Sequence, residues 1–190
     1  MQTTPFLSQY GPWALVSGAA MGLGAEFARQ LAARGLNLLL LDVQSEALNA
    51  TSAAISAQSG VELRPLVCDL ATPAGLAAVI EAAATLEVGL LVNNAGVSAL
   101  GHFLDVPLEK HQRILALNTC APLTLAHHFG QKMRERRRGG IIFVSSASAM
   151  VGTSYVSAYS ASKAFNLNLG EALWQELHPF GVDVLASVVG

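Results

Sequence analysis

The sequence is poor in charge, in cysteine and in long apolar runs. Only 13% of its 190 residues are charged and the net charge is −2, so neither nucleic acid nor an anionic membrane surface is expected as a partner. The two cysteines, Cys68 and Cys120, lie too far apart to suggest a disulfide framework or a zinc site, and they suit a reducing compartment. The longest apolar runs, such as residues 38–41, are too short to span a bilayer. We therefore expect a cytoplasmic protein.

Other missing features argue against a secreted protein and against a metal-binding protein. The first ten residues lack the basic and apolar regions of a secretory signal. No metal site is expected, because the neighbouring His127 and His128 point apart on a helix and the other histidines have no spaced partners. The basic run 134–138 is interpreted as a helix C-terminus, where cations complement the helix dipole, with Gly139 as its cap.

What the chain has in abundance is apolar side chains, at 52% of its residues. Short apolar runs alternate with longer amphipathic stretches, which is typical of a buried parallel sheet covered by helices. We therefore expect an α/β fold, a doubly wound, Rossmann-like parallel sheet with helices on both faces, as one domain over residues 1–190. The pattern predicts strands over 13–18, 36–42, 61–67, 88–93, 140–146 and 182–188, and helices over 23–34, 44–58, 73–86, 107–138 and 155–178.

A glycine-rich turn joins the first predicted strand to the first helix. Gly18, Gly22 and Gly24 have the spacing G-x-x-x-G-x-G, a variant of the dinucleotide-binding fingerprint. Gly18 permits a tight turn, Gly22 lets a pyrophosphate approach the backbone, and Gly24 lets the helix pack closely. The helix N-terminus offers free N–H groups to the phosphates. A flexible turn is the alternative, but the position between strand and helix favours a cofactor site, to which Met21 and Leu23 are also assigned.

Asp42 stands at the end of the second predicted strand. A carboxylate there can accept hydrogen bonds from both hydroxyls of an adenosine ribose and would repel a 2′-phosphate. No Arg or Lys lies in the glycine turn or directly after Asp42, so NAD is favoured over NADP. The alternative is that Asp42 only caps the helix that begins near Ser45.

Tyr159 and Lys163 lie four residues apart in a predicted helix, so the phenol and the ammonium project from one face. A neighbouring cation favours the phenolate form, which makes Tyr159 a candidate general acid for a ketone and general base for an alcohol. Such a pair can also be a simple surface contact. Ser160 and Lys163 match the S-x-x-K motif of penicillin-binding enzymes, but their S-D-N and K-T-G motifs are absent, which argues against a hydrolase.

With these motifs in place, the chain resembles the short-chain dehydrogenase/reductase family from about residue 13 to residue 190. Residues 93–96 resemble the family's N-N-A-G segment, which lies beside the adenosine and holds the sheet together, and its cofactor residues are Asn94, Ala95 and Gly96. Asp69 and Leu70 resemble the segment that borders the adenine. The resemblance implies that these five residues belong to the cofactor site.

The family resemblance also implies catalytic roles. Ser146 lies thirteen residues before Tyr159, the spacing of the family's catalytic serine, which hydrogen-bonds the substrate oxygen. Lys163 would in addition hold the nicotinamide ribose. Asn118 matches the helix asparagine that links the lysine to solvent through a water. The implied activity is hydride transfer between NAD and a small-molecule secondary alcohol or ketone, with Tyr159 as general acid and base.

The sequence departs from the family in two places. The turn after the last predicted strand reads Val189-Gly190 where the family usually has Pro-Gly. The substrate-loop helices and the seventh strand that the family has next do not occur within the 190 residues. In the family, the helices that correspond to 107–138 and 155–178 pack against a second subunit, so the resemblance implies a homodimer or homotetramer. The substrate itself is left open.

Two other functions remain open at this point. Nucleotide-sugar epimerases and dehydratases share the Tyr–Lys pair, but their usual glycine spacing is G-x-x-G-x-x-G, which differs from the spacing here. A sensor or scaffold that binds NAD without turnover is the second alternative. Such proteins often lack the tyrosine or the lysine, and this chain has both.

Overall fold

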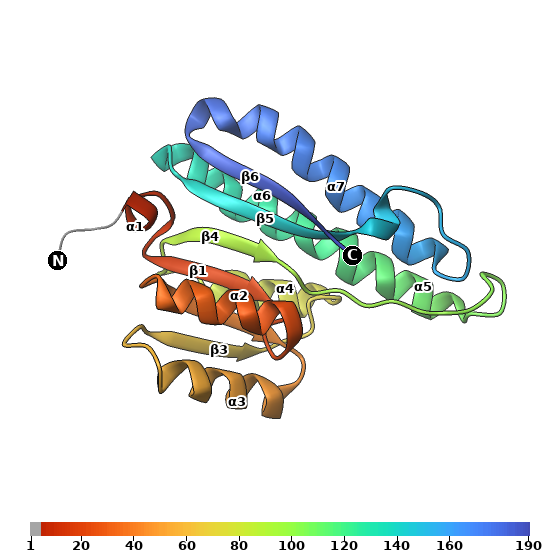
Figure 1. Ribbon diagram of the computed structural model, residues 1–190, viewed down its shortest axis with the longest axis horizontal. Helices are drawn as coiled ribbons and strands as arrows, with labels where there is room; N and C mark the ends of the chain where they lie inside the picture. The colour runs from red at the N-terminus through yellow and green to blue at the C-terminus, as the bar shows by residue number, and fades with distance from the viewer. Residues whose placement is uncertain (1–4) are drawn as a thin grey trace.

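Continuous apolar runs form a six-stranded sheet in the computed structural model, which describes residues 5–190 (Figure 1). Every neighbouring pair of strands is parallel, and the order is β3-β2-β1-β4-β5-β6. This order confirms the predicted doubly wound sheet, whose connections reverse direction between β1 and β4. The strands are β1 (Trp13–Ser17), β2 (Asn37–Asp42), β3 (Leu63–Val67), β4 (Val88–Asn93), β5 (Gly139–Ser146) and β6 (Val182–Val189).

Helices cover both faces of the sheet. Figure 1 shows α2 on the near face, with α4 and α6 behind the sheet. None of the described helices is long and apolar enough to cross a bilayer. The helices are α1 (Pro5–Tyr10), α2 (Gly22–Ala33), α3 (Ser45–Ser56), α4 (Pro73–Ala82), α5 (Leu108–Leu115), α6 (Ala121–Arg136) and α7 (Ser157–Leu177).

Each strand contributes alternate side chains to two separate cores. Trp13 and Leu15 of β1 pack with residues of α4, α6 and α7, whereas Ala14 and Val16 pack with residues of α2 and α3. This alternation explains why the central strands β1, β2 and β4 are almost wholly apolar, because both of their faces are buried. The two cores hold the carboxyl ends of the strands in a fixed arrangement, and the candidate site lies at those ends.

Two helices differ from the prediction. The short helix α1 was not expected, because six residues carry little periodicity, and it forms where Phe6 and Tyr10 pack against the α2-side core. The helix predicted over 107–138 is interrupted by a five-residue π-helix, Ala116–Cys120. Pro122, two residues after the π-helix, has no N–H for the carbonyl of Asn118 four residues before it, so an α-helix cannot continue unbroken there.

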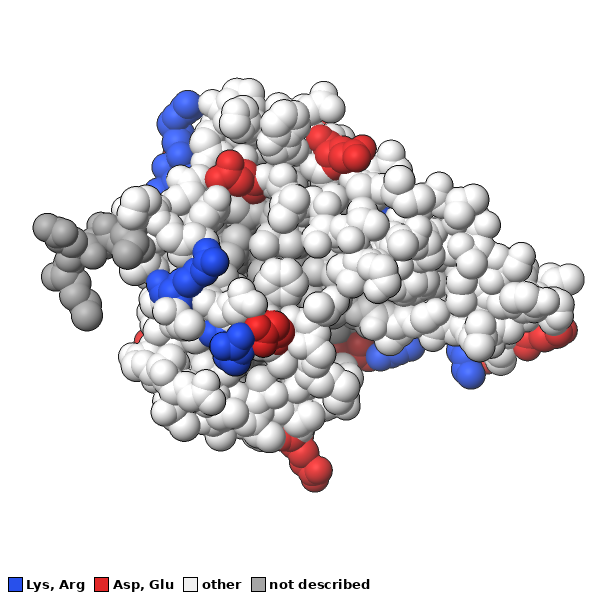
Figure 2. Space-filling model, in the orientation of Figure 1, with Lys and Arg blue, Asp and Glu red and all other residues white. Residues whose placement is uncertain are grey.

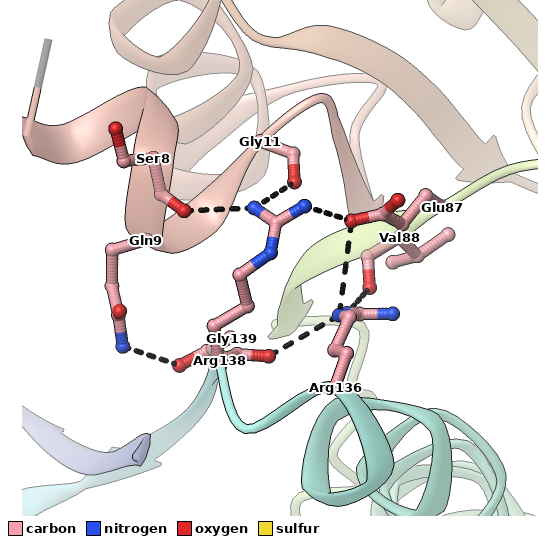
Figure 3. Close-up of polar contacts among 8 residues, drawn as sticks. All are labelled: Ser8, Gln9, Gly11, Glu87, Val88, Arg136, Arg138 and Gly139. Atoms are coloured by element: carbon pink, nitrogen blue, oxygen red, sulfur yellow. Dashed lines mark hydrogen bonds and ion pairs between the residues drawn. The ribbon is translucent and has the colours of Figure 1, made fainter. Parts of the chain in front are cut away.

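The basic run at the end of α6 is tied to the protein at the amino ends of the strands (Figure 3). Arg138 donates to the carbonyls of Ser8 and Gly11 at 2.7 and 3.3 Å and pairs with Glu87. Arg136 is 3.9 Å from the same carboxylate and donates to the Val88 carbonyl. These contacts join α1 to β4 and β5, so the arginines serve the fold.

The prediction that Gly139 caps α6 is wrong. Arg137 takes the left-handed conformation, with φ of 56°, and so ends α6 two residues before Gly139. Gly139 already begins β5. The left-handed position tolerates an arginine because the segment is held on both sides by the contacts of Arg136 and Arg138.

The near face of β5 and β6 carries no helix within residues 5–190 (Figure 1). Leu185 and Val188 of β6 are exposed on this edge strand. A groove lies between this face and helices α1 and α2, with Phe6 and Phe27 among its lining residues. Figure 2 shows that the centre of this face is largely uncharged, with acidic and basic side chains around it.

Candidate active site

The carboxyl ends of β1 and β4 meet where the strand order reverses, which is where open α/β sheets bind ligands. The Asn94 side chain donates to the carbonyls of Ser17 and Gly18 at 2.9 and 3.1 Å. The Ser17 hydroxyl in turn accepts the N–H groups of Asn94 and Ala95, both at 3.0 Å. These bonds lock the glycine turn to the segment after β4 and so fix the floor of a crevice.

The three glycines of the turn have three different surroundings. A Cβ added to Gly24 would lie 2.0 Å from the Gly18 carbonyl oxygen, so the first turn of α2 packs directly on the glycine turn. A Cβ on Gly18 would lie 2.9 Å from the Ala95 Cα, and its φ of +66° also favours glycine. A Cβ on Gly22 would meet nothing within 4 Å. Gly22 is therefore the glycine that faces open space, where a phosphate can approach.

A first hollow lies on the β2 and β3 side of the crevice. Asp42 accepts the N–H groups of Ala20 and Gln44, each at 3.0 Å. Asp69 binds both ends of the Arg113 guanidinium, at 3.0 and 3.2 Å, and this contact lowers the pKa of Asp69. Both carboxylates thus face one space. The expected cofactor residues that line it are Gly18, Met21, Asp42, Asp69, Leu70, Asn94, Ala95 and Gly96.

A second hollow continues from the first towards β5 and β6. Asn94, Gly96 and Val97 line both hollows, so the two form one elongated cleft along the edge of the sheet. Two connected hollows with Gly18 and Gly96 in their lining suit a dinucleotide, with one nucleotide in each hollow. Of the expected site residues, the second hollow is lined by Leu23, Asn94, Gly96, Ser146, Tyr159 and Lys163.

Lys163 is buried beneath Tyr159. Its Nζ lies 5.7 Å from the centre of the Tyr159 ring and donates to the Val144 carbonyl at 2.8 Å. Burial lowers the pKa of Lys163 to about 8, because a desolvated ammonium is disfavoured. The group therefore still carries its charge at neutral pH in most molecules, and it releases a proton more readily than a surface lysine.

The two serines that end β5 have different environments. The Ser145 hydroxyl is buried and donates to the Lys163 carbonyl at 2.8 Å, which ties β5 to α7. The Ser146 hydroxyl accepts hydrogen bonds from the N–H and the hydroxyl of Ser148, at 3.3 and 3.0 Å. Both contacts use Ser146 as an acceptor, so its own O–H remains able to donate to a ligand in the hollow.

Asn118 lies behind the cleft and does not line it. Its side chain accepts the Val97 N–H and donates to the Val97 carbonyl, both at 2.9 Å, and it donates to the Ser162 hydroxyl at 3.0 Å. The residue is 0% exposed. It is separated from Lys163 by Gly96, whose added Cβ would be 3.3 Å from Asn118 Oδ1 and 3.4 Å from Lys163 Nζ.

Several residues of the cleft carry no local sequence signal. Arg113 on α5 and Cys68 after β3 border the first hollow, and Val144 and Val189 border the second. Each lies at a strand end or on a helix that only the tertiary fold brings to the cleft. Val43 also borders the first hollow, and it could have been predicted because it directly follows Asp42, an expected cofactor residue.

Comparison with known proteins places the chain among dehydrogenases. The family model for short chain dehydrogenases matches residues 12–190. The chain is 31% identical over 182 residues to the 7beta-hydroxysteroid dehydrogenase of Collinsella aerofaciens. The matched region covers 96% of this chain and 69% of the relative. It is 35% identical over 185 residues to the inactive hydroxysteroid dehydrogenase-like protein 1 of Homo sapiens, which covers 96% of the chain and 56% of the relative.

A solved structure agrees with these relatives. The short-chain dehydrogenase from Sphingobium yanoikuyae in complex with NADPH superposes with a TM-score of 0.90 at 35% identity, over 95% of this chain and 72% of that chain. A doubly wound sheet with a cleft at its switch point has the architecture of a dinucleotide-binding protein. The chain belongs to the short-chain dehydrogenase family. The expected reaction class is thereby confirmed: hydride transfer between NAD(P) and a secondary alcohol or ketone.

Proposed function

We propose that Tyr159 is the general acid and base of the reaction, assisted by Lys163 and Ser146. The observation that carries this proposal is that the three side chains line one hollow, and that this hollow continues into the glycine-floored one. A bound nicotinamide cofactor supplies or accepts the hydride. The protein holds the reacting alcohol and moves its proton.

In the oxidation direction, the Tyr159 phenolate accepts the hydroxyl proton of the alcohol. To the Lys163 ammonium, 5.7 Å from the centre of the Tyr159 ring, we assign the positive charge that compensates the charge on the tyrosine oxygen during proton transfer. The Ser146 hydroxyl donates to the substrate oxygen and stabilises the charge that develops there. Asn118 is assigned the link from Lys163 to solvent through a water, a role that rests on the family resemblance. Ketone reduction uses the same groups in reverse.

We propose that the cofactor is NAD in preference to NADP. Asp42 lines the first hollow, where its charge would oppose a 2′-phosphate. The cation that borders this hollow, Arg113, is already bound by Asp69 through two hydrogen bonds. The similar Sphingobium protein was solved with NADPH, so the preference of this chain needs a direct measurement.

Replacing Asp42 tests the cofactor preference. We expect Asp42→Ala to lower the ratio of kcat/KM for NAD over NADP by about 10- to 100-fold, the value of hydrogen bonds to a charged group. Asp42→Arg should lower the ratio further or reverse it. Glu46→Gln, which removes an exposed carboxylate in the first turn of α3, should leave the ratio unchanged. An unaltered ratio in both Asp42 variants would mean that this carboxylate does not contact the ribose.

We infer that the substrate is a secondary alcohol or ketone on a bulky apolar group. The loops after β4 and after β5 meet through a 3.0 Å hydrogen bond from the Gly101 N–H to the Tyr155 carbonyl. Leu100 and Leu104 on the first loop are 82% and 91% exposed, and Met150 on the second is 70% exposed. Exposed apolar side chains on loops that follow the strand ends at the cleft favour an apolar ligand. The Collinsella relative acts on a hydroxysteroid, as its name states.

A panel of alcohols tests the proposed activity. The full chain is mixed with NAD or NADP and hydroxysteroids, long-chain 3-hydroxyacyl thioesters, small polyols or simple secondary alcohols, and formation of the reduced nicotinamide is followed by absorbance. We expect turnover with the bulky apolar members. Turnover with none of them, together with measurable NAD binding, would favour the alternative of a binding protein without activity. That alternative has support in the 35% identical human relative, whose name describes it as inactive.

We propose a homodimer or homotetramer that forms through α6 and α7. These helices lie side by side (Figure 1), and a groove between them is lined by Leu123 and Leu169. Leu123 is exposed on this face. Sedimentation of the purified chain measures the assembly mass, and a monomer would contradict the proposal.

We also propose a cytoplasmic location, which the two free cysteines, Cys68 and Cys120, support.

A further inference from the structure

A buried amide lies on the same helix as the proposed catalytic pair. Asn166 follows Lys163 by three residues and Tyr159 by seven, so the three side chains project from one side of α7. Asn166 is only 4% exposed. A buried amide costs free energy unless its polar atoms are hydrogen-bonded. Its partners therefore indicate its role.

Asn166 donates a hydrogen bond to a carbonyl that lacks an α-helical donor on its own helix. Its Nδ2 donates to the main-chain carbonyl of Asn118 at 2.9 Å. That carbonyl lies in the π-helix and has no α-helical donor, because the residue four positions later is Pro122. Buried carbonyls need a partner, and Asn166 supplies it from another helix.

The orientation of this amide follows from its partner. A carbonyl can only accept, so the Asn166 nitrogen must face Asn118 and the oxygen must face the other way. Among the described residues, Asn166 Oδ1 is a buried atom without a hydrogen-bond partner. An apolar side chain would avoid the cost of this unpaired oxygen. The bond to Asn118 is thus the contact that offsets the burial of Asn166.

The π-helix that Asn166 holds forms a wall beside Lys163. Gly96 separates Asn118 from the ammonium, and a methyl group on Gly96 would already be 3.3 Å from Asn118 Oδ1 and 3.4 Å from Lys163 Nζ. The Asn118 side chain also reaches Ser162, the neighbour of Lys163 in α7. A displacement of the π-helix is therefore transmitted to the surroundings of the ammonium.

We propose that Asn166 is a positioning residue for the reaction: by binding the Asn118 carbonyl, it fixes the π-helix against Lys163 and so orients the ammonium that assists Tyr159. This inference rests on the proposed roles of Tyr159 and Lys163. Asn166 touches neither substrate nor cofactor in this assignment. Its effect passes through Asn118 and Gly96.

The test compares two asparagines of α7. Asn166→Leu keeps the size of the side chain and removes the bond, whereas Asn168→Leu removes an exposed asparagine that donates only to the Ala164 carbonyl, one turn before it. For Asn166→Leu, we expect kcat to fall on the order of tenfold, the effect of a small displacement of catalytic groups, with less than a twofold change in the KM for NAD. The solvent deuterium isotope effect on kcat should increase, and amide exchange over residues 116–120 should accelerate. Asn168→Leu should leave all four quantities unchanged.

An isosteric variant separates this role from simple packing. In Asn166→Asp, a protonated carboxyl can donate to the Asn118 carbonyl, while a carboxylate repels it. The kcat of this variant relative to the parent chain should therefore rise as the pH falls, and that of Asn166→Leu should not. A purely structural role would give parallel pH profiles for the two variants.

The outcomes distinguish this inference from the proposed function. Unchanged amide exchange over 116–120 in Asn166→Leu overturns the inference, and so does faster exchange with an unchanged kcat and isotope effect. A parent chain that turns over but loses nothing in Tyr159→Phe contradicts the proposed function instead. A parent chain without turnover also contradicts the proposed function, and amide exchange in the variants then still shows whether Asn166 holds the π-helix.

Discussion

Tyr159→Phe is expected to abolish turnover while the cofactor still binds. The change removes one oxygen atom and leaves the aromatic ring above Lys163, so the hollow keeps its shape. Without the phenol, no group in the second hollow accepts the alcohol proton, and loss of a general base costs on the order of 10²–10⁴-fold in rate. The kcat is measured with the best alcohol of the panel, and NAD affinity is measured by titration calorimetry.

Tyr10→Phe is the matched control for this substitution. The Tyr10 hydroxyl donates to Asp183 at 2.8 Å at the opposite edge of the sheet, and burial raises the pKa of Tyr10 to about 12. The Tyr10→Phe substitution removes the same oxygen atom, but far from the cleft, and should leave kcat unchanged. Retained turnover in Tyr159→Phe would show that another group carries the proton. Loss of NAD binding would show that the ring itself had moved.

Gly24→Ala is expected to disrupt the fold and the cofactor site together. The added methyl would lie 2.0 Å from the Gly18 carbonyl oxygen and 2.6 Å from the Asn94 amide nitrogen. Neither atom can withdraw without opening the glycine turn or breaking the Asn94 bonds that close it. Overpacking of this kind costs about 3 kcal/mol or more, which corresponds to a fall in Tm of roughly 6–12 °C for a domain of this size.

Two other glycines serve as controls for Gly24. A methyl on Gly60 or on Gly22 would meet nothing within 4 Å. Gly60→Ala should therefore change neither Tm nor NAD affinity. Gly22 has a φ of +57°, so its alanine variant should lose about 1–2 kcal/mol of stability and bind NAD more weakly. Thermal denaturation and NAD titration of the three variants separate these effects, and a Gly24→Ala protein as stable as Gly60→Ala would refute the packing argument.

The order of elements and the proposed chemistry follow closely from local patterns. Continuous apolar runs such as Leu38–Leu41 predicted buried parallel strands, since a strand covered on both faces has no polar side. The spacing of Gly18, Gly22 and Gly24 predicted a tight turn before a helix. The four-residue spacing of Tyr159 and Lys163 placed them on one helix face.

Other features depend on contacts between distant segments. The ion pair of Asp69 with Arg113 joins residues 44 positions apart, and no local sequence pattern predicts it. The interruption of the long predicted helix has a local cause in Pro122. The bond from Asn166 that completes it comes from another helix, 48 positions from Asn118.

The sequence by itself determined the residues to which we assign the chemistry: the glycines of the turn, Asp42, and the Tyr159–Lys163 pair. Those properties are set by side-chain type and by short spacings along one element, which are the same in any fold that keeps the element. Only the tertiary structure decided that the ends of β1 and β4 meet in one cleft, that Lys163 is buried, and that Asn118 is held from behind by Asn166. Burial and long-range contacts depend on how whole helices and strands pack. The residues that contribute to this packing energy lie far apart in the sequence, so a local pattern cannot predict it.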